Sequence, residues 1–285
     1  MTDADACAAR VDPDRLRTEL RLVSGPVADR LENAIVETEA FALARDGFLL
    51  HLPNGLSFEY RVGTGVTVER RAEVGDGELE LYLNGSVRAA VAWLNGLVPI
   101  HASAIVHNGE ATCFTGASGA GKSTLVAELG ARGYPMQADD LIVLELSPDA
   151  APACLPGGGT LKLWADAIAM TGVHARHRVR PHLEKRYAEP AGGLGDRSAP
   201  LARIYRLLPS NEISIREISG TSALEQVPAL LHRPQFYEPL ATPARHWSLL
   251  TGLSRQVRFF DFHRPIDPAR FHEGVDALEA HFRGG

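Results

Sequence analysis

One stretch of the sequence combines glycines, a lysine and a serine at a spacing that suits phosphate binding. Two glycines separated by four residues are followed directly by Lys122 and Ser123. Glycine lets the backbone turn successive N–H groups toward one anion and leaves no Cβ in its way. Lys122 is expected to reach the terminal phosphates of a nucleotide, and Ser123 to give its hydroxyl to Mg²⁺. The predicted nucleotide-binding residues are Gly116, Ala117, Ser118, Gly119, Ala120, Gly121, Lys122, Ser123 and Thr124.

The segments around this loop have the patterns that a phosphate-binding loop requires. Residues 111–115 form a short apolar run typical of a buried strand, and residues 124–132 have helical spacing. Gly133 is expected to end that helix. A strand, a glycine-rich loop and a helix N-terminus therefore follow one another, and the helix dipole adds to the attraction for an anion. A glycine-rich turn that matches by chance is the weaker interpretation.

Two adjacent carboxylates, Asp139 and Asp140, follow the predicted helix within an apolar segment. Two acids in such surroundings are costly unless a cation compensates them. A β-α-β crossover would return the chain parallel to the strand before the loop, so a carboxylate at the end of the returning strand would face the γ-phosphate. Mg²⁺ would then be the compensating cation, with Ser123 as a predicted ligand. The alternative is a turn with two solvated acids, which the apolar residues 141–144 make less favourable.

His101 lies in a predicted strand, residues 98–106, that precedes the loop. Asn108-Gly109 accepts the positive φ angles of a type I′ turn, so this strand is expected to pair with residues 111–115 as a hairpin. That pairing would bring His101 toward the nucleotide. A structural role and a functional role for His101 are both consistent with the sequence.

A basic stretch, residues 174–186, lies inside a segment from 173 to 200 that is predicted to be a loop. It contains Arg176, Arg178, Arg180, Lys185 and Arg186. A solvated face is the usual meaning of such a run, and a mobile lid or a docking strip for an acidic substrate is the alternative. Lys162, in a predicted short strand 160–164, is either a phosphate contact or a solvated lysine.

The remaining elements are predicted from periodicity and turn residues. Asp12 is expected to cap a first helix that starts at Pro13, and a second helix to start at Pro26 with Val27, Leu31 and Ile35 inward. Strands are predicted over 48–52, 57–62, 67–71 and 78–83, and a helix over 87–94. Beyond the basic stretch, we expect a strand pair 201–208 and 213–218, a helix capped by Ser222 and Glu225, a helix 245–253, a strand 256–262 and a helix 267–282. These patterns divide the chain into an N-terminal helical and β-rich region, 1–96, and a catalytic domain, 97–285.

Composition excludes several classes of function. The 285 residues are 45% hydrophobic and 22% charged, with a net charge of −6, so no overall positive field favours nucleic acid. Cys7, Cys113 and Cys154 have no metal-ligand spacing, which favours a reducing compartment. The first residues are acidic and have no apolar segment of the kind found in signal sequences, and the chain has no apolar run of about 18 residues. We therefore expect a cytoplasmic protein with neither a membrane nor a nucleic acid as its partner.

Taken together, the strand histidine, the hairpin, the phosphate-binding loop and the acidic pair resemble the C-terminal catalytic domain of HPr kinase/phosphorylase and its relatives. The matching residues are His101-Ala-Ser-Ala104, Gly116 to Ser123 and Ala138-Asp139-Asp140. The resemblance covers about residues 98–146. It implies an α/β fold, a P-loop kinase core with a mixed β-sheet flanked by helices, preceded here by the small β-rich region. It also implies that Asp139 is the base that accepts the proton of a substrate serine, that Asp140 supports it and the Mg²⁺, and that His101 and Lys122 lie beside them.

The chain departs from HPr kinases at several positions. Ala117 and Thr124 stand where those enzymes have Asp and Glu, and Gly159-Thr-Leu-Lys-Leu-Trp replaces their Glu-Ile-Arg-Gly signature. These differences argue against phosphorylase activity and against HPr as the substrate. The chain is more similar to divergent relatives of these enzymes. Some of those relatives phosphorylate a serine on the precursor of a ribosomally synthesised peptide, such as a lasso peptide. A homo-oligomer is a further expectation of the resemblance.

The function predicted from the sequence is an ATP- and Mg²⁺-dependent serine kinase that acts on a peptide or small protein. A small-molecule kinase of the shikimate-kinase type is one alternative, although it predicts a compact lid instead of a β-rich N-terminal region. A non-catalytic nucleotide-binding regulator is the other, and it predicts that Asp139 can be lost without loss of function.

Overall fold

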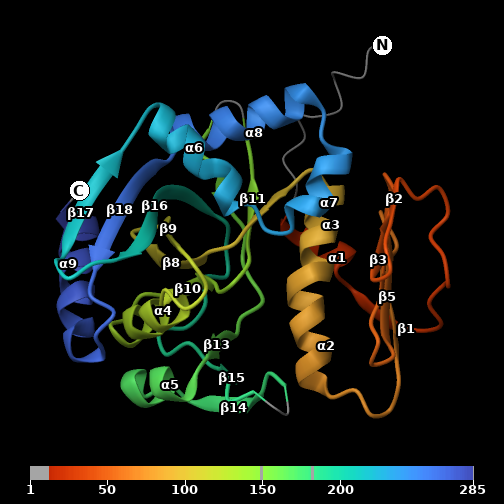
Figure 1. Cartoon of the computed structure of the whole chain (residues 1–285), viewed down its shortest axis with the longest axis horizontal. Helices are drawn as coiled ribbons and strands as arrows, with labels where there is room; N and C mark the ends of the chain where they lie inside the picture. The colour runs from red at the N-terminus through yellow and green to blue at the C-terminus, as the bar shows by residue number, and fades with distance from the viewer. Residues whose placement is uncertain (1–12, 148–149, 181–182, 285) are drawn as a thin grey trace.

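The computed structural model describes residues 13–147, 150–180 and 183–284, and it confirms a mixed α/β protein. Cys7 and Asp12 lie outside the described residues. A six-stranded sheet stands at one side of the molecule, a nine-stranded mixed sheet runs through the rest, and a helical column lies between the two (Figure 1). No helix in the described ranges is both long and apolar enough to cross a bilayer.

The six-stranded sheet forms from the first 70 residues, after the short helix α1 (Pro13–Glu19). Its strands follow the spatial order β1-β6-β5-β4-β3-β2, and β5 shows strict alternation, with Leu56, Phe58 and Tyr60 buried on one face. The predicted strands 48–52, 57–62 and 67–71 are confirmed. The bounds are β1 (Leu22–Ser24), β2 (Val36–Glu37), β3 (Phe41–Leu43), β4 (Gly47–His51), β5 (Leu56–Arg61) and β6 (Gly65–Arg70).

The helix predicted from Pro26 to Ile35 is wrong. This segment is an irregular connection between β1 and β2. Leu31 is buried, and Val27 packs against the same small cluster, whereas Ile35 is 41% exposed. The apolar spacing therefore reflected packing under a loop. The strands β1 to β3 were not predicted because each has only two or three residues and so shows little periodicity.

The helical column consists of α2 (Asp76–Tyr82), a π-helical turn η1 (Leu83–Val87) and α3 (Arg88–Leu94). The predicted strand 78–83 is therefore wrong, whereas the helix 87–94 is confirmed. Glu and Leu alternate over residues 78–81, which suggested a strand, but Leu79, Tyr82 and Leu83 have helical spacing and pack against the main core. Trp93 in α3 is fully buried in that core.

The nine-stranded sheet is built around β9 (Glu110–Thr115). The hairpin to β8 (Ser103–His107) is confirmed, with Asn108 and Gly109 at φ 51° and 80°. After helix α4 (Lys122–Ala131), strand β10 (Met136–Ala138) pairs antiparallel with β8. It therefore runs in the same direction as β9, as the crossover predicted, but β8 lies between the two strands.

The strand predicted over 98–106 is interrupted at His101. Strand β7 (Val98–Ile100) pairs with β11 (Ile142–Glu145), whereas β8 pairs with β9. His101 lies in the bend between β7 and β8, where its N–H donates to Leu230 O at 2.7 Å. A side chain at this break is not held in the alternation of either strand.

The other half of the sheet comes from the C-terminal part of the chain. Strand β16 (Ala199–Pro209) is parallel to both β9 and β18 (Arg258–Arg264), and β17 (Ser214–Ile218) is antiparallel to β18. The predicted pair 201–208 with 213–218 is thus wrong, because β18 lies between them. The capping box is also wrong: Gly220 is the N-cap of α6 (Thr221–Leu230), and no described side chain caps it. The other helices are α7 (Pro234–Tyr237), η2 (Glu238–Leu240), α8 (Pro243–Gln256), η3 (Pro268–Arg270) and α9 (Phe271–Gly284).

The segment predicted as a basic loop forms part of a small sheet. Strand β15 (Arg186–Ala188) lies between β13 (Leu161–Leu163) and β14 (Ala175–Arg178), antiparallel to both. Helix α5 (Ala165–Thr171) follows β13 directly, and Gly172 at φ 65° ends it. Strand β12 (Ala153–Cys154) joins β11 to the start of β16.

Candidate functional site

The glycine-rich loop lies between β9 and α4, as predicted. Gly116, Gly119 and Gly121 all have positive φ angles, of 147°, 82° and 85°, which side-chain-bearing residues rarely adopt. Gly121 is the N-cap of α4, and it has no side chain that could cap the first N–H groups of the helix. The N-terminus of α4 is therefore left with unsatisfied donors and a positive dipole, which suits an anion.

Lys122 lies along this loop and is only 8% exposed. Its Nζ donates to Gly116 O at 2.9 Å and to Ala117 O at 3.3 Å. Burial lowers the pKa of this ammonium below its ordinary value, although Asp139 and Asp140 oppose that shift. The lysine is thus held across the mouth of the loop, where a terminal phosphate would meet its charge.

Arg264, at the end of β18, supports the loop from behind. It is 7% exposed, and its Nη2 donates to Ala120 O at 2.6 Å. Gly121 has φ 85°, which strains any residue with a side chain, and a Cβ built there would lie 2.5 Å from the same Nη2, so the guanidinium would also have to move. Sequence reasoning missed Arg264 because it lies more than 140 residues beyond the loop and belongs to no local motif.

Asp139 follows β10 and accepts hydrogen bonds from three donors. Its Oδ1 accepts from Ser123 Oγ at 2.8 Å and from Ser103 Oγ at 2.6 Å, and its Oδ2 accepts from the Lys162 N–H at 3.1 Å. Both carboxylate oxygens are therefore oriented by neighbouring elements. Ser103 was not predicted, although it follows His101 by two residues within the stretch that resembles HPr kinases.

Asp140 has different surroundings from those of its neighbour. Its backbone is left-handed, with φ 70°, and its carboxylate pairs with Lys162 Nζ and lies 3.5 Å from His101 Nδ1. Burial opposes its ionisation, but the charge and hydrogen bond of Lys162 outweigh that effect and hold the pKa well below the usual range. Asp140 is thus ionised, and its side chain remains 35% exposed. The sequence left the role of Lys162 open between phosphate and solvent, and here it pairs with a carboxylate.

His101 lies beside Asp140 at the bend between β7 and β8. Its Nδ1 is 2.9 Å from Asp140 O, and its ring stacks on His232 with the centroids 5.8 Å apart. Burial, with help from Lys122, lowers the pKa of His101 below its ordinary value. The imidazole is therefore neutral near pH 7.

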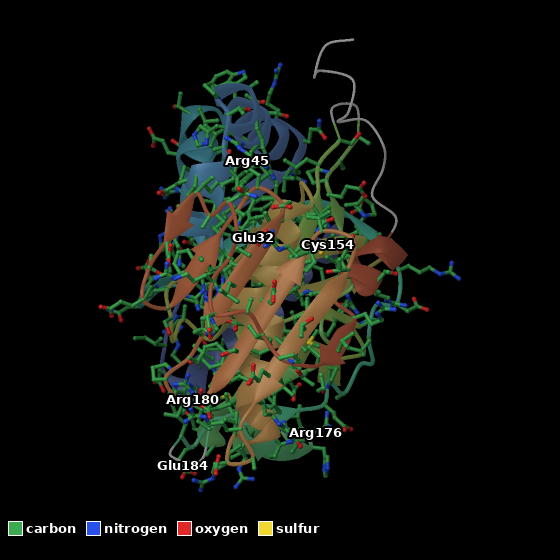
Figure 2. The ribbon with its side chains drawn as sticks, turned by 90° about the vertical axis from the view of Figure 1, so that its right-hand side faces the viewer. Glu32, Arg45, Cys154, Arg176, Arg180 and Glu184 are labelled. Atoms are coloured by element: carbon green, nitrogen blue, oxygen red, sulfur yellow. The ribbon has the colours of Figure 1, made fainter. Side chains whose placement is uncertain are left out.

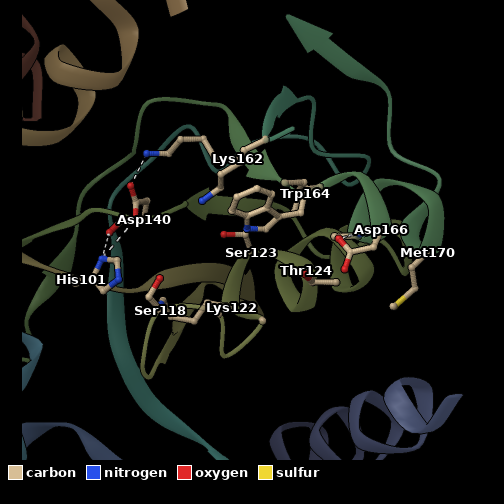
Figure 3. Close-up of a pocket in the computed structure, with 15 residues that line it drawn as sticks. His101, Ser118, Lys122, Ser123, Thr124, Asp140, Lys162, Trp164, Asp166 and Met170 are labelled. Atoms are coloured by element: carbon tan, nitrogen blue, oxygen red, sulfur yellow. Dashed lines mark hydrogen bonds and ion pairs between the residues drawn. The ribbon is translucent and has the colours of Figure 1, made fainter. Parts of the chain in front are cut away.

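A pocket of about 200 Å³ opens over the loop and contains most of the predicted residues (Figure 3). Asp140 and His101 lie at one end, Ser118, Lys122 and Ser123 along the middle, and Thr124 toward the other end. Asp139 instead lines a separate polar cavity of about 20 Å³ behind the loop. Gly116 and Ala117 line a third cavity, of about 270 Å³, on the side of β16 and α6, which also includes His101.

Within the described part of the basic stretch, Lys185 lines the pocket. Arg178 Nη2 lies 2.8 Å from Glu184 Oε1 and Arg180 Nε lies 3.7 Å from Glu78 Oε1, whereas Arg186 donates to Arg176 O. Arg176, Arg180 and Glu184 lie toward the lower edge of the molecule in Figure 2. The acidic partners are what a solvated structural face would have.

The oxygen atoms around Ser123 suit a magnesium ion. Mg²⁺ is usually held by a few protein oxygens together with phosphates and water, and Ser123 Oγ and Asp139 Oδ1 are 2.8 Å apart. Among the residues that the structure describes, no group of three or more His, Cys, Asp or Glu side chains could hold a metal ion. A metal here would therefore need phosphate or water ligands as well. The residues present therefore fit Mg²⁺ bound together with a nucleotide.

No protein-family model and no curated protein matches this chain. Among solved structures, the Hpr(Ser) kinase/phosphatase from Coxiella burnetii is similar over 65% of this chain and 97% of its own, with 12% sequence identity and a TM-score of 0.34. A similarity of this size is too low to assign a function, so the geometry of the site has to support one.

Proposed function

We propose that this protein is a Mg²⁺-dependent kinase that transfers the γ-phosphate of ATP to a serine hydroxyl of a peptide or small protein. The observation that supports this most is the set of contacts around Asp139. The Asp139 carboxylate joins Ser123, which follows the loop lysine, to Ser103 at the start of β8, and the Asp140 carboxylate faces the pocket. Phosphate binding alone would need the loop and the lysine, but not two oriented acids.

The loop, Lys122 and the N-terminus of α4 would bind and orient the triphosphate. Ser123 and Asp139 would hold Mg²⁺, which neutralises charge on the phosphates when it is bound. Arg264 keeps the loop in shape through Ala120 O. These residues supply positioning and charge, which are the main requirements of phosphoryl transfer.

The geometry favours an exchange of the two carboxylate roles that the sequence resemblance implied. Asp139 accepts three hydrogen bonds and does not line the main pocket, whereas Asp140 does. We therefore assign the metal role to Asp139 and the base role to Asp140. As the serine oxygen bonds to the γ-phosphorus and the bond from that phosphorus to the departing ADP oxygen breaks, the serine proton would pass to Asp140, and Lys162 would hold that carboxylate in place.

The proposal that the acceptor is a peptide, such as the precursor of a lasso peptide, rests on the resemblance of residues 98–146 to HPr kinases and their relatives. A screen of serine peptides with γ-³²P-labelled ATP tests it. Wild-type protein is expected to label at least one peptide on serine in the presence of Mg²⁺. If no peptide is labelled although ATP binds, the regulator becomes the better account.

Lys122→Ala is the first variant for that assay. The buried ammonium would no longer meet the phosphates, so ATP affinity should fall by about tenfold or more and transfer by on the order of 10². Arg258→Ala is the control, because Arg258 is a half-exposed surface partner of Glu217. Wild-type affinity and turnover in Lys122→Ala would show that the loop does not bind the nucleotide.

A further inference from the structure

Trp164 presents a large, half-exposed aromatic ring to the pocket over the loop. It lines the pocket over the loop and is 49% exposed, whereas Trp93 is fully buried in the core. Its backbone is fixed, because Trp164 follows β13 and is the N-cap residue of α5. An exposed indole on a rigid element inside a pocket is a surface on which a flat ligand can stack.

The pocket has two chemically different ends. Asp140 and Lys162 form a charged end beside His101, whereas Ala167 and Met170 of α5 contribute apolar side chains to the other end, next to Asp166. Figure 3 shows Asp140 and His101 on one side of Ser123, and Asp166 and Met170 on the other. Trp164 projects into the space between them, above Ser123 in that view.

The direction of a bound nucleotide follows from these two ends. In the proposed reaction the γ-phosphate must face the carboxylate that accepts the proton, so it lies toward Asp140. The α-phosphate and the nucleoside must then extend the other way, past Ser123 and Thr124 toward α5. A base placed there would meet the indole of Trp164 and the apolar residues around it.

We propose that Trp164 forms a stacking subsite for the purine base of the nucleoside triphosphate. This inference rests on the proposed function, which sets the direction of the nucleotide. Lys185 Nζ lies 5.9 Å from the centroid of the indole ring, so the ring is also held by a cation–π contact. Stacking on an aromatic side chain stabilises a bound base to an extent that alanine substitution measures directly.

The test compares two ligands that both carry a chain of three phosphates, of which one also carries a nucleoside. Dissociation constants for the ATP analogue AMP-PNP and for inorganic tripolyphosphate are measured by calorimetry, with Mg²⁺, for wild type, Trp164→Ala and Trp164→Phe. Trp164→Ala should weaken AMP-PNP binding by roughly five- to a hundredfold and leave tripolyphosphate within about twofold. Trp164→Phe should keep most of the wild-type affinity for AMP-PNP, because phenylalanine keeps an aromatic ring.

Trp247→Ala is the matched control, since Trp247 is 63% exposed in α8 and does not line the pocket. Unchanged AMP-PNP affinity in Trp164→Ala, or an equal loss for both ligands, would overturn the subsite. If Trp164→Ala changed only the KM for the peptide, the subsite would also be overturned, because Trp164 would then contact the acceptor peptide. If wild type binds neither ligand, it is the proposed function that fails.

Discussion

Asp139 and Asp140 are adjacent in the chain, yet their carboxylates meet different partners. Asp139 accepts from Ser103, Ser123 and the Lys162 backbone, whereas Asp140 pairs with the Lys162 side chain beside His101. Lys162 therefore contacts both acids, one through its N–H and one through its ammonium. The left-handed backbone at Asp140 directs the two side chains apart, and a strained residue of this kind is common at functional sites.

His232 provides a prediction about pH. Burial lowers its pKa to about 4, with His101, Arg233 and Lys162 adding to the shift and Asp140 opposing it. Its Nε2 is buried without a hydrogen-bond partner among the described residues. The unfolded chain therefore binds the proton more readily than the folded one, and the free energy of unfolding should fall as pH drops from 6.5 toward 4.

Urea unfolding at pH 7 and pH 4.5 measures this effect. His232→Gln should lose about 1 to 2 kcal/mol less than wild type between the two pH values. His174→Gln, at an exposed position, should behave as wild type. Equal losses in wild type and His232→Gln would show that His232 is not the group responsible.

At the scale of elements, the helical column α2–η1–α3 connects the N-terminal sheet to the small sheet of β13, β14 and β15. A Cβ built on Gly77 would lie 2.6 Å from Arg178 O and 3.0 Å from Val179 O, both of them backbone atoms. Gly77→Ala should therefore lower the free energy of unfolding by about 1 to 3 kcal/mol.

Gly85→Ala is the matched control within the same column. Nothing in the described residues lies within 4 Å of a Cβ built there, so alanine should be neutral or stabilising by up to about 1 kcal/mol. Chemical unfolding of the two variants gives the comparison. Equal changes would mean that α2 does not pack closely on β14.

The strand, loop and helix around Gly116–Ser123 could be predicted because turn residues and apolar periodicity agree there. The same holds for the Asn108-Gly109 hairpin and for the acidic pair. Local pattern could not predict that β18 lies between β16 and β17, because this order depends on residues far apart in the chain. Arg264 and Ser103 were missed for the same reason: their roles come from tertiary contacts. The alternation at 78–81 misled because tertiary packing overrode it.

At the scale of the whole molecule, the boundary expected at residue 96 does not separate two cores. One hydrophobic cluster includes Phe58 of the N-terminal sheet, Trp93 of α3, and Ile142 and Phe259 of the large sheet. Glu80, Asn84 and Arg88 of the helical column also line the small cavity behind Asp139. The N-terminal part therefore contributes side chains to the surroundings of Asp139.

The most direct test of the proposed kinase is single-turnover transfer from ATP to the best serine peptide, at saturating concentrations of both. Asp140→Asn should bind ATP within a few-fold of wild type, while transfer falls by on the order of 10² or more and does not recover when Mg²⁺ is raised. Asp139→Asn should also transfer slowly, but raised Mg²⁺ should recover part of its activity. Near-normal transfer by Asp140→Asn would contradict the assignment of the base, and near-normal function of both variants would favour a nucleotide-binding regulator.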